Sequence, residues 1–225
     1  MGSVRAITFD FNGTLSNDEP ILCGIFRELF AERGRPLSEQ DYYDRLAGLS
    51  DEAIVTTWLG AEYDDVGGAV AERVSRYRAL VADGSSIAEP TREAVRYAAA
   101  RVPIAIVSGA ALAEIEPVVE AAGIASLFRA IVSSDSVEHG KPHPESYEVV
   151  LAELGVEPSE ALAFEDTESG VASATGAGMR CIAVRGTLPP GRLARAEELI
   201  DTLDVEVVRR VLGDPVLCDP VPVGP

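Results

Sequence analysis

Lysine is almost absent from this chain, and histidine is scarce. Among the 225 residues, nineteen side chains are lysine or arginine, but eighteen of these are arginine and only Lys141 is lysine. The chain has two histidines. Because the sequence uses arginine nearly everywhere else, the single lysine predicts a site at Lys141 that a guanidinium group does not fit.

Basic residues are far fewer than acidic ones: the chain has 19 basic and 37 acidic residues and a net charge of −18. Nucleic acids and anionic membranes require basic patches, so neither is expected as a partner. No apolar run approaches the ~20 residues of a membrane span, and the N-terminus lacks the pattern of a signal peptide. We therefore expect a cytoplasmic protein with a small phosphorylated molecule as partner, while the oligomeric state stays open.

Cysteine is also rare and follows no metal-ligand spacing. The three residues are Cys23, Cys181 and Cys218. Cys23 falls in a helical apolar pattern and Cys181 in an expected strand, which predicts small buried side chains. An odd number of scattered cysteines is typical of a reducing compartment.

Short apolar runs alternate with helical patterns, and this alternation predicts an α/β fold: a Rossmann-like, doubly wound parallel sheet. The expected strands are Ala6–Phe11, Pro103–Val107, Ala130–Val132, Ala161–Phe164 and Arg180–Val184. The expected helices are Glu93–Ala100, Leu112–Ala122, Pro144–Leu154, Gly170–Ala177, Ala194–Ile200 and Val205–Leu212.

One segment interrupts the alternation, because residues 16–84 contain no convincing strand. Apolar residues there recur at helical spacing, as in Ile21–Phe30 and Val70–Val81. We expect a discontinuous core of residues 1–15 and 85–213, with an all-helical cap of residues 16–84 inserted between its parts and able to act as a lid. The proline-rich residues 214–225 are expected to form an extended or disordered tail.

Polar residues follow the expected strands in an order that suits phosphoryl transfer. Asp10 ends the first strand, Ser108 follows the second, Lys141 follows the third, and Glu165 and Asp166 end the fourth. Because the carboxyl ends of parallel strands share one edge of a sheet, these side chains should lie together.

Each residue type has a role in that chemistry. Asp10 is the expected nucleophile, forming an aspartyl-phosphate that divides one difficult step into two. Ser108 and backbone N–H groups around Gly109 and Asn12 would donate hydrogen bonds to phosphoryl oxygens, and Lys141 would neutralise charge. Glu165 and Asp166 would complete an Mg²⁺ site with Asp10.

Four segments together resemble the haloacid dehalogenase superfamily hydrolases, in the branch that includes β-phosphoglucomutase and phosphoglycolate phosphatase. The segments are FDFNGTL, IVSGA, GKPHPE and FEDTESGVASATGAGM, and the resemblance extends over about residues 4 to 212. It implies a Rossmann-like core, a helical cap, Mg²⁺ dependence and an aspartyl-phosphate intermediate. It also places Gly13, Thr14, Ser108, Gly109 and Lys141 around the phosphate.

The chain departs from this family at Asn12, where the phosphatases carry an aspartate that protonates the leaving alcohol and then activates water. An amide cannot exchange a proton at neutral pH, though its backbone carbonyl can still bind the metal. Losing general acid–base help costs ~10²–10⁴ in rate. Four alternatives stay open: a slow phosphatase that favours good leaving groups, a proton donor elsewhere in cap or core, a phosphometabolite-binding protein without turnover, and an engineered trap.

A phosphomutase is a further alternative, and it would need a site for a second phosphate. Ser50 and Arg45 are the candidate ligands for it in the cap. The residue after Ser50 is Asp51, whose negative charge would repel a second phosphate. Monophosphate substrates are therefore favoured.

Overall fold

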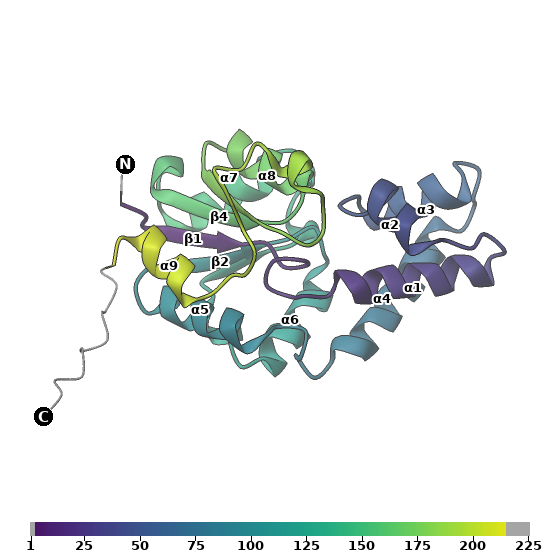
Figure 1. The fold of residues 1–225 in the computed structure, drawn as a ribbon, viewed down its shortest axis with the longest axis horizontal. Coiled ribbons are helices and arrows are strands. Elements are labelled where there is room, and N and C mark those ends of the chain that lie inside the picture. Colours follow the sequence, from purple (N-terminus) through teal and green to yellow (C-terminus); the bar gives the residue numbers. More distant parts are fainter. Residues whose placement is uncertain (1–2, 215–225) are drawn as a thin grey trace, which may run out of the picture.

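The computed structural model describes residues 3–214 and shows one parallel sheet between helices (Figure 1). Its six strands lie in the order β3-β2-β1-β4-β5-β6. The strands are β1 Ala6–Phe9, β2 Ile104–Val107, β3 Ala130–Val132, β4 Ala161–Glu165, β5 Arg180–Val184 and β6 Glu198–Ile200. The strand order and parallel pairing confirm the predicted α/β, Rossmann-like fold.

Helices cover both faces of the sheet, with α7 and α8 on one face and α5, α6 and α9 on the other (Figure 1). Their bounds are α5 Glu89–Ala99, α6 Leu112–Ala121, α7 Glu145–Leu154, α8 Glu168–Gly176 and α9 Val205–Leu212. Short 3₁₀ turns span Ala125–Leu127, Ser134–Ser136, Pro158–Glu160 and Pro190–Leu193.

Side-chain size alternates along the strands and gives the sheet two unlike faces. Large residues such as Ile7, Phe9 and Phe164 pack on the side of α5, α6 and α9. The other face carries small residues such as Ala105 and Ala163, which leave room for α7 and α8 to approach. This period-two pattern sets the register, because a shift by one residue would exchange the two faces.

Between β1 and α5 the chain forms four helices and no strand: α1 Glu19–Glu32, α2 Glu39–Arg45, α3 Asp51–Leu59 and α4 Val66–Val81. They extend beyond the end of the sheet that the site occupies (Figure 1). Within residues 3–214, no helix is both long and apolar enough to span a membrane.

One predicted helix is wrong. Instead of a helix over Ala194–Ile200, the chain forms a 3₁₀ turn that ends at Leu193 and then strand β6. The residues before Ile200 favour helix by propensity, but Ile182–Val184 pair with Glu198–Ile200 and override that local preference. The predicted tail and Cys218 lie outside the described residues from 215 onward, while Cys23 and Cys181 are buried as expected.

Candidate active site

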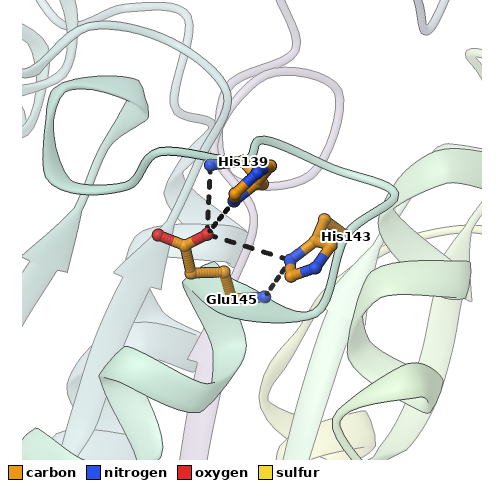
Figure 2. A group of neighbouring side chains, drawn as sticks. All are labelled: His139, His143 and Glu145. Carbon is orange, nitrogen blue, oxygen red and sulfur yellow. Dashed lines mark hydrogen bonds and ion pairs between the residues drawn. The ribbon is translucent and has the colours of Figure 1, made fainter.

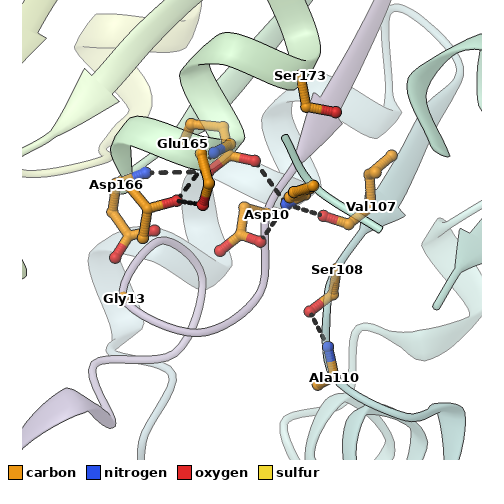
Figure 3. Close-up of polar contacts among 12 residues, drawn as sticks. Asp10, Gly13, Val107, Ser108, Ala110, Glu165, Asp166 and Ser173 are labelled. Carbon is orange, nitrogen blue, oxygen red and sulfur yellow. Dashed lines mark hydrogen bonds and ion pairs between the residues drawn. The ribbon is translucent and has the colours of Figure 1, made fainter. Parts of the chain in front are cut away.

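The polar residues that follow the strands meet at the carboxyl edge of the sheet (Figure 3), around a cavity of about 510 Å³. The sheet edge contributes Asp10, Ser108, Lys141 and Asp166, and the helices contribute Glu19, Tyr42, Asp51 and Arg73. A second hollow, of about 440 Å³, lies at the opposite edge and is lined by no acidic residue. The chemistry therefore belongs to the cavity at the carboxyl edge.

Lys141 is the cationic centre of this edge. Its Nζ lies 2.7 Å from Asp10 Oδ1, 2.5 Å from Glu165 Oε1 and 2.9 Å from the carbonyl oxygen of Val107. An ammonium group offers three donors around one nitrogen and matches these three acceptors, whereas a planar guanidinium does not. This geometry explains why the chain's single lysine stands here.

Charge keeps Lys141 protonated despite its burial. Burial by itself lowers the pKa of Lys141, but the nearby charges of Asp10 and Glu165 outweigh burial and raise the pKa above its ordinary value. The ammonium therefore stays charged at neutral pH and can neutralise an incoming phosphate as well as Asp10.

The loop that carries Lys141 is fastened on both sides of it (Figure 2). The Glu145 carboxylate accepts the backbone N–H of His139 at 3.1 Å and lies 2.8 Å from Nδ1 of that ring. His143 Nδ1 accepts the N–H of Glu145, and the His143 carbonyl accepts the Ser173 hydroxyl at 2.6 Å. These three side chains could hold a metal ion, but Nδ1 of each histidine and the Glu145 carboxylate already make contacts that hold the loop.

Three carboxylates that the sequence suggests as metal ligands lie together and could hold a metal ion. Asp10, Glu165 and Asp166 each offer an oxygen, and these atoms lie within 4.8 Å of one another. Asp166 Oδ2 accepts the hydroxyl of Thr187, while its Oδ1 is buried and has no hydrogen-bond partner within the described residues. An unpartnered buried carboxylate oxygen is expensive, and a cation would satisfy it.

The protonation of these groups indicates the same need for a cation. Burial raises the pKa of Asp166 well above its ordinary value, and the charges of Asp10 and Glu165 raise it further. Burial also raises the pKa of Asp10 to about 7, although Lys141 opposes that shift. A divalent cation would favour the ionised forms, so these residues fit a metal site.

Gly13 brings the loop after β1 close to this cluster. Its φ is +76°, and a Cβ there would lie 1.9 Å from Asp166 Oδ2, so a larger residue would displace the carboxylate. Its N–H is already used, because it donates to Ser16 O at 2.8 Å and to Asp18 Oδ1 at 3.3 Å. The hydroxyl of Thr14 is buried away from the cavity lining. In this structure, therefore, neither the Gly13 N–H nor the Thr14 hydroxyl is directed to the cavity, and their phosphate contacts stay predictions.

Ser108 and Gly109, which the sequence suggests as phosphate ligands, both line the cavity. Ser108 Oγ accepts the backbone N–H of Ala110 at 3.1 Å (Figure 3). This bond orients the side chain and leaves its O–H available to donate to an anion in the cavity.

Asn12 lines the cavity, but its amide is tied to residues behind it. The NH₂ group donates to Asp18 Oδ2 at 2.9 Å and to the Tyr77 hydroxyl at 3.4 Å. Tyr77 also donates to Asp18, which is fully buried. Burial raises the pKa of Asp18, while its hydrogen bonds from Tyr77 and Asn12 lower it. Asn12 therefore joins the loop to helix α4 through Asp18 and Tyr77.

The two cap residues suggested for a second phosphate have different positions. Ser50 lines the cavity and caps helix α3 by accepting the N–H of Ala53 at 3.3 Å. The structure does not bring Arg45 to the site: its side chain is 54% exposed, and its guanidinium lies over the Trp58 ring at 5.1 Å. Arg45 ends helix α2 and is not among the residues that line the cavity, so its suggested contact with a second phosphate stays a prediction.

A buried ion triad, which no local sequence pattern indicates, joins helices α3, α4 and α6. Arg73 of α4 is 6% exposed and pairs with Asp51 of α3 and with Glu114 of α6. The negative charge of Asp51 is thus partly compensated, and Arg73 is already engaged by two carboxylates. Long-range pairing of this kind leaves no local signal in the sequence.

Sequence analysis also missed Glu19 and Tyr42 as residues of the site. Glu19 begins helix α1 and resembles an ordinary acidic residue of a first helical turn. In the structure it is 9% exposed, lines the cavity, and accepts the Tyr42 hydroxyl at 2.9 Å. The packing of α2 against α1 brings the Tyr42 hydroxyl to this carboxyl group and contributes to its burial.

Known proteins resemble this chain in sequence over most of its length. A family described as haloacid dehalogenase-like hydrolase matches residues 7–184. Protein CbbY of Cereibacter sphaeroides is 30% identical over 210 residues, covering 87% of this chain and 88% of that protein. Validoxylamine A 7′-phosphate phosphatase of Streptomyces hygroscopicus subsp. limoneus is 28% identical over 204 residues, covering 88% and 94%.

A solved structure has the same fold. A crystal structure of a CbbY mutant from Rhodobacter sphaeroides in complex with xylulose-(1,5)bisphosphate superposes with a TM-score of 0.78 at 28% identity. It covers 89% of this chain and 95% of that one. The family match spans well over half of the sequence and includes the strands that carry Asp10, Ser108, Lys141 and Asp166. The chain belongs to the haloacid dehalogenase-like hydrolases.

Proposed function

We propose that this hydrolase is a phosphatase that acts on a small phosphomonoester through an aspartyl-phosphate at Asp10. The observation that carries the proposal is the buried Asp10 carboxylate, 2.7 Å from Lys141 Nζ at the end of a cavity. One Asp10 oxygen is held by the ammonium, so the other is free to attack phosphorus. Lys141 and Ser108 would stabilise the negative charge on the phosphoryl oxygens while the phosphoryl group is transferred from the substrate to Asp10.

We propose Mg²⁺ as the metal, held by carboxylate oxygens of Asp10, Glu165 and Asp166 and by the backbone carbonyl of Asn12. Oxygen ligands are those that Mg²⁺ prefers. When bound, the ion would screen the repulsion between Asp10 and the anionic substrate and polarise the phosphoryl group. The unpartnered Asp166 Oδ1 supports this assignment.

We propose residues 16–84 as a cap over a core of residues 1–15 and 85–213. Helices α1–α4 provide one wall of the cavity and the sheet edge provides the other. Arg73 of α4 and Glu114 of α6 link the two parts by an ion pair beside the cavity. A cap closed in this way would exclude water from the reaction.

The negative charge of the cavity lining would disfavour substrates whose alcohol part is itself anionic. Among the described residues that line it, Arg73 is the only basic residue besides Lys141, and Asp51 and Glu114 already neutralise that side chain. Further carboxylates of the lining are Glu19, Glu52, Asp135 and Glu138. We therefore propose a monophosphate of a neutral or amine-bearing polyol, and the same charges disfavour the phosphomutase alternative, which needs a second phosphate.

The relatives are consistent with a phosphorylated polyol. One of them is named for a phosphate ester of validoxylamine A, and the CbbY structure holds a sugar bisphosphate. A second phosphate of that kind would meet Asp51 and Glu114 here. Sugar monophosphates should therefore be preferred over bisphosphates and over phosphoglycolate.

Phosphate release, measured with Mg²⁺ across a panel of phosphomonoesters and acyl phosphates, tests the proposal. We expect the parent protein to release phosphate from at least one sugar monophosphate or acyl phosphate, and Asp10→Asn to release none. If the parent protein is stabilised by phosphorylated ligands but releases no phosphate, a binding protein without turnover is the better account. Activity only in Asn12→Asp would indicate an intact site that lacks its proton donor.

A further inference from the structure

The proposed phosphatase reaction needs a proton donor that Asn12 cannot provide. An alkoxide leaving group must gain a proton as its bond to phosphorus breaks, and the water that later attacks must lose one. Both donor hydrogens of the Asn12 amide are directed to Asp18 and Tyr77. The site must therefore obtain the proton from another side chain.

Asp18 is close in sequence but is unsuited to this role. It lies behind Asn12, is fully buried, and is absent from the residues that line the cavity. Its carboxylate accepts hydrogen bonds from Tyr77, Asn12 and the backbone of Gly13. Asp18 thus orders the loop and is separated from any substrate.

Glu19, the next residue, has the required position. It lines the same cavity as Asp10 and Asn12, yet its burial limits contact with bulk water. Tyr42 donates a hydrogen bond to Oε1 at 2.9 Å, which fixes the carboxyl group. Among the described residues, Oε2 has no hydrogen-bond partner, so this oxygen is free to exchange a proton with a ligand in the cavity.

We propose that Glu19 is the general acid and base of this hydrolase, in place of the carboxylate that Asn12 lacks. The inference rests on the proposed phosphatase function. In the first step an Asp10 oxygen bonds to phosphorus, the ester P–O bond breaks, and the Glu19 carboxyl gives its proton to the leaving oxygen. In the second step a water oxygen bonds to phosphorus, the Asp10–phosphorus bond breaks, and Glu19 recovers a proton from that water.

The surroundings of Glu19 suit proton exchange near neutral pH. Its pKa is raised to about 7, and burial is the largest cause. The hydrogen bond from Tyr42 and the charge of Arg73 lower the pKa, whereas the charges of Asp18 and Asp51 raise it. Both protonation states are therefore populated at the pH where the enzyme would work. The charged and titratable groups that interact with it are Asp18, Cys23, Tyr42, Tyr43, Asp51, Arg73 and Asp166.

The test compares substrates whose leaving groups differ in their need for a proton. Parent protein, Glu19→Gln and the exposed α1 control Glu28→Gln are assayed with Mg²⁺ on an alkyl phosphate and on acetyl phosphate. For Glu19→Gln we expect kcat/KM on the alkyl phosphate to fall by ~10²–10⁴, and kcat/KM on acetyl phosphate to stay within about threefold. Acetyl phosphate should leave phosphoenzyme accumulated on Asp10, because its hydrolysis also needs Glu19.

Two further readouts separate proton transfer from a structural role. The limb of the parent kcat/KM profile near pH 7 should disappear in Glu19→Gln, and adding Asn12→Asp to that variant should restore alkyl phosphate turnover. Equal losses on both substrates, or an unchanged alkyl phosphate rate, would overturn the role of Glu19 and leave the phosphatase proposal standing. Absence of phosphate release from the parent on every substrate would overturn both.

Discussion

Replacing Lys141 by methionine tests how the buried charges of the site are balanced. Methionine has nearly the length of lysine but no charge, so it would leave Asp10 and Glu165 facing each other with the carbonyl of Val107 nearby. Lys141 and Asp10 side chains are each 9% exposed and that of Glu165 is fully buried, so water cannot replace the ammonium. Folding stability, measured without metal, should therefore fall sharply.

The size of the loss follows from this burial. Removing one partner of a buried ion pair costs about 3–5 kcal/mol, which for a chain of this length lowers Tm by roughly 6–20 °C. Arg185→Met is the matched control, because its pair with Asp201 is exposed and should contribute at most about 1 kcal/mol. Urea unfolding and calorimetry of both variants measure the difference.

The pH dependence gives the prediction its sign. Burial raises the pKa of Asp10 in the folded state, and removal of Lys141, which opposes that shift, would raise it further, so the folded variant holds a proton at Asp10 more tightly than the unfolded chain does. The stability gap between parent and Lys141→Met should be widest at neutral pH and should close as the pH falls toward about 4. A loss of less than 1 kcal/mol at pH 7, or a gap that widens in acid, would refute the charge balance described here.

Three further predictions concern other buried charges. Because the pKa of Glu19 rises to about 7 on folding, the parent should lose about 3 kcal/mol of stability relative to Glu19→Gln between pH 4 and pH 8. Urea unfolding that gives the same difference in stability between the two proteins at both pH values would contradict this. Arg73→Met should lower folding stability by about 3–5 kcal/mol by leaving Asp51 and Glu114 unpaired. Adding Glu114→Gln to that variant should recover part of the loss. An Arg73→Met variant as stable as the parent would refute the triad. Mg²⁺ at a hundredfold excess over its Kd should stabilise the parent by about 2.7 kcal/mol and Asp166→Asn far less, which calorimetry with and without EDTA checks.

Local patterns were sufficient for the sheet and for the residues at its carboxyl edge. Strands such as Ile104–Val107 are short apolar runs, and the residue that follows each run must lie at the shared edge. Asp10 and Ser108 could therefore be predicted without coordinates. The exception is Glu198–Ile200, whose strand depends on a neighbour distant in sequence.

Burial and long-range pairing could not be predicted, and they decide what the cavity does. Nothing near Arg73 in the sequence indicates that Asp51 and Glu114 neutralise it. Glu19 has the sequence context of any helix start, and the packing of α2 against α1 contributes to its burial. Arg45 is the opposite example: it is close to Ser50 in sequence, which suggested a phosphate ligand, but in the structure its guanidinium lies over the Trp58 ring.

The most direct test of the proposed mechanism is to look for phosphate on Asp10. The parent and the Asp10→Asn variant are mixed with acetyl phosphate and Mg²⁺, quenched in acid and analysed by peptide mass spectrometry. We predict a phosphoryl group on Asp10 in the parent and none in the peptide of Asp10→Asn. Phosphate release by the parent without any phosphorylation of Asp10, or undiminished release by Asp10→Asn, would contradict the account.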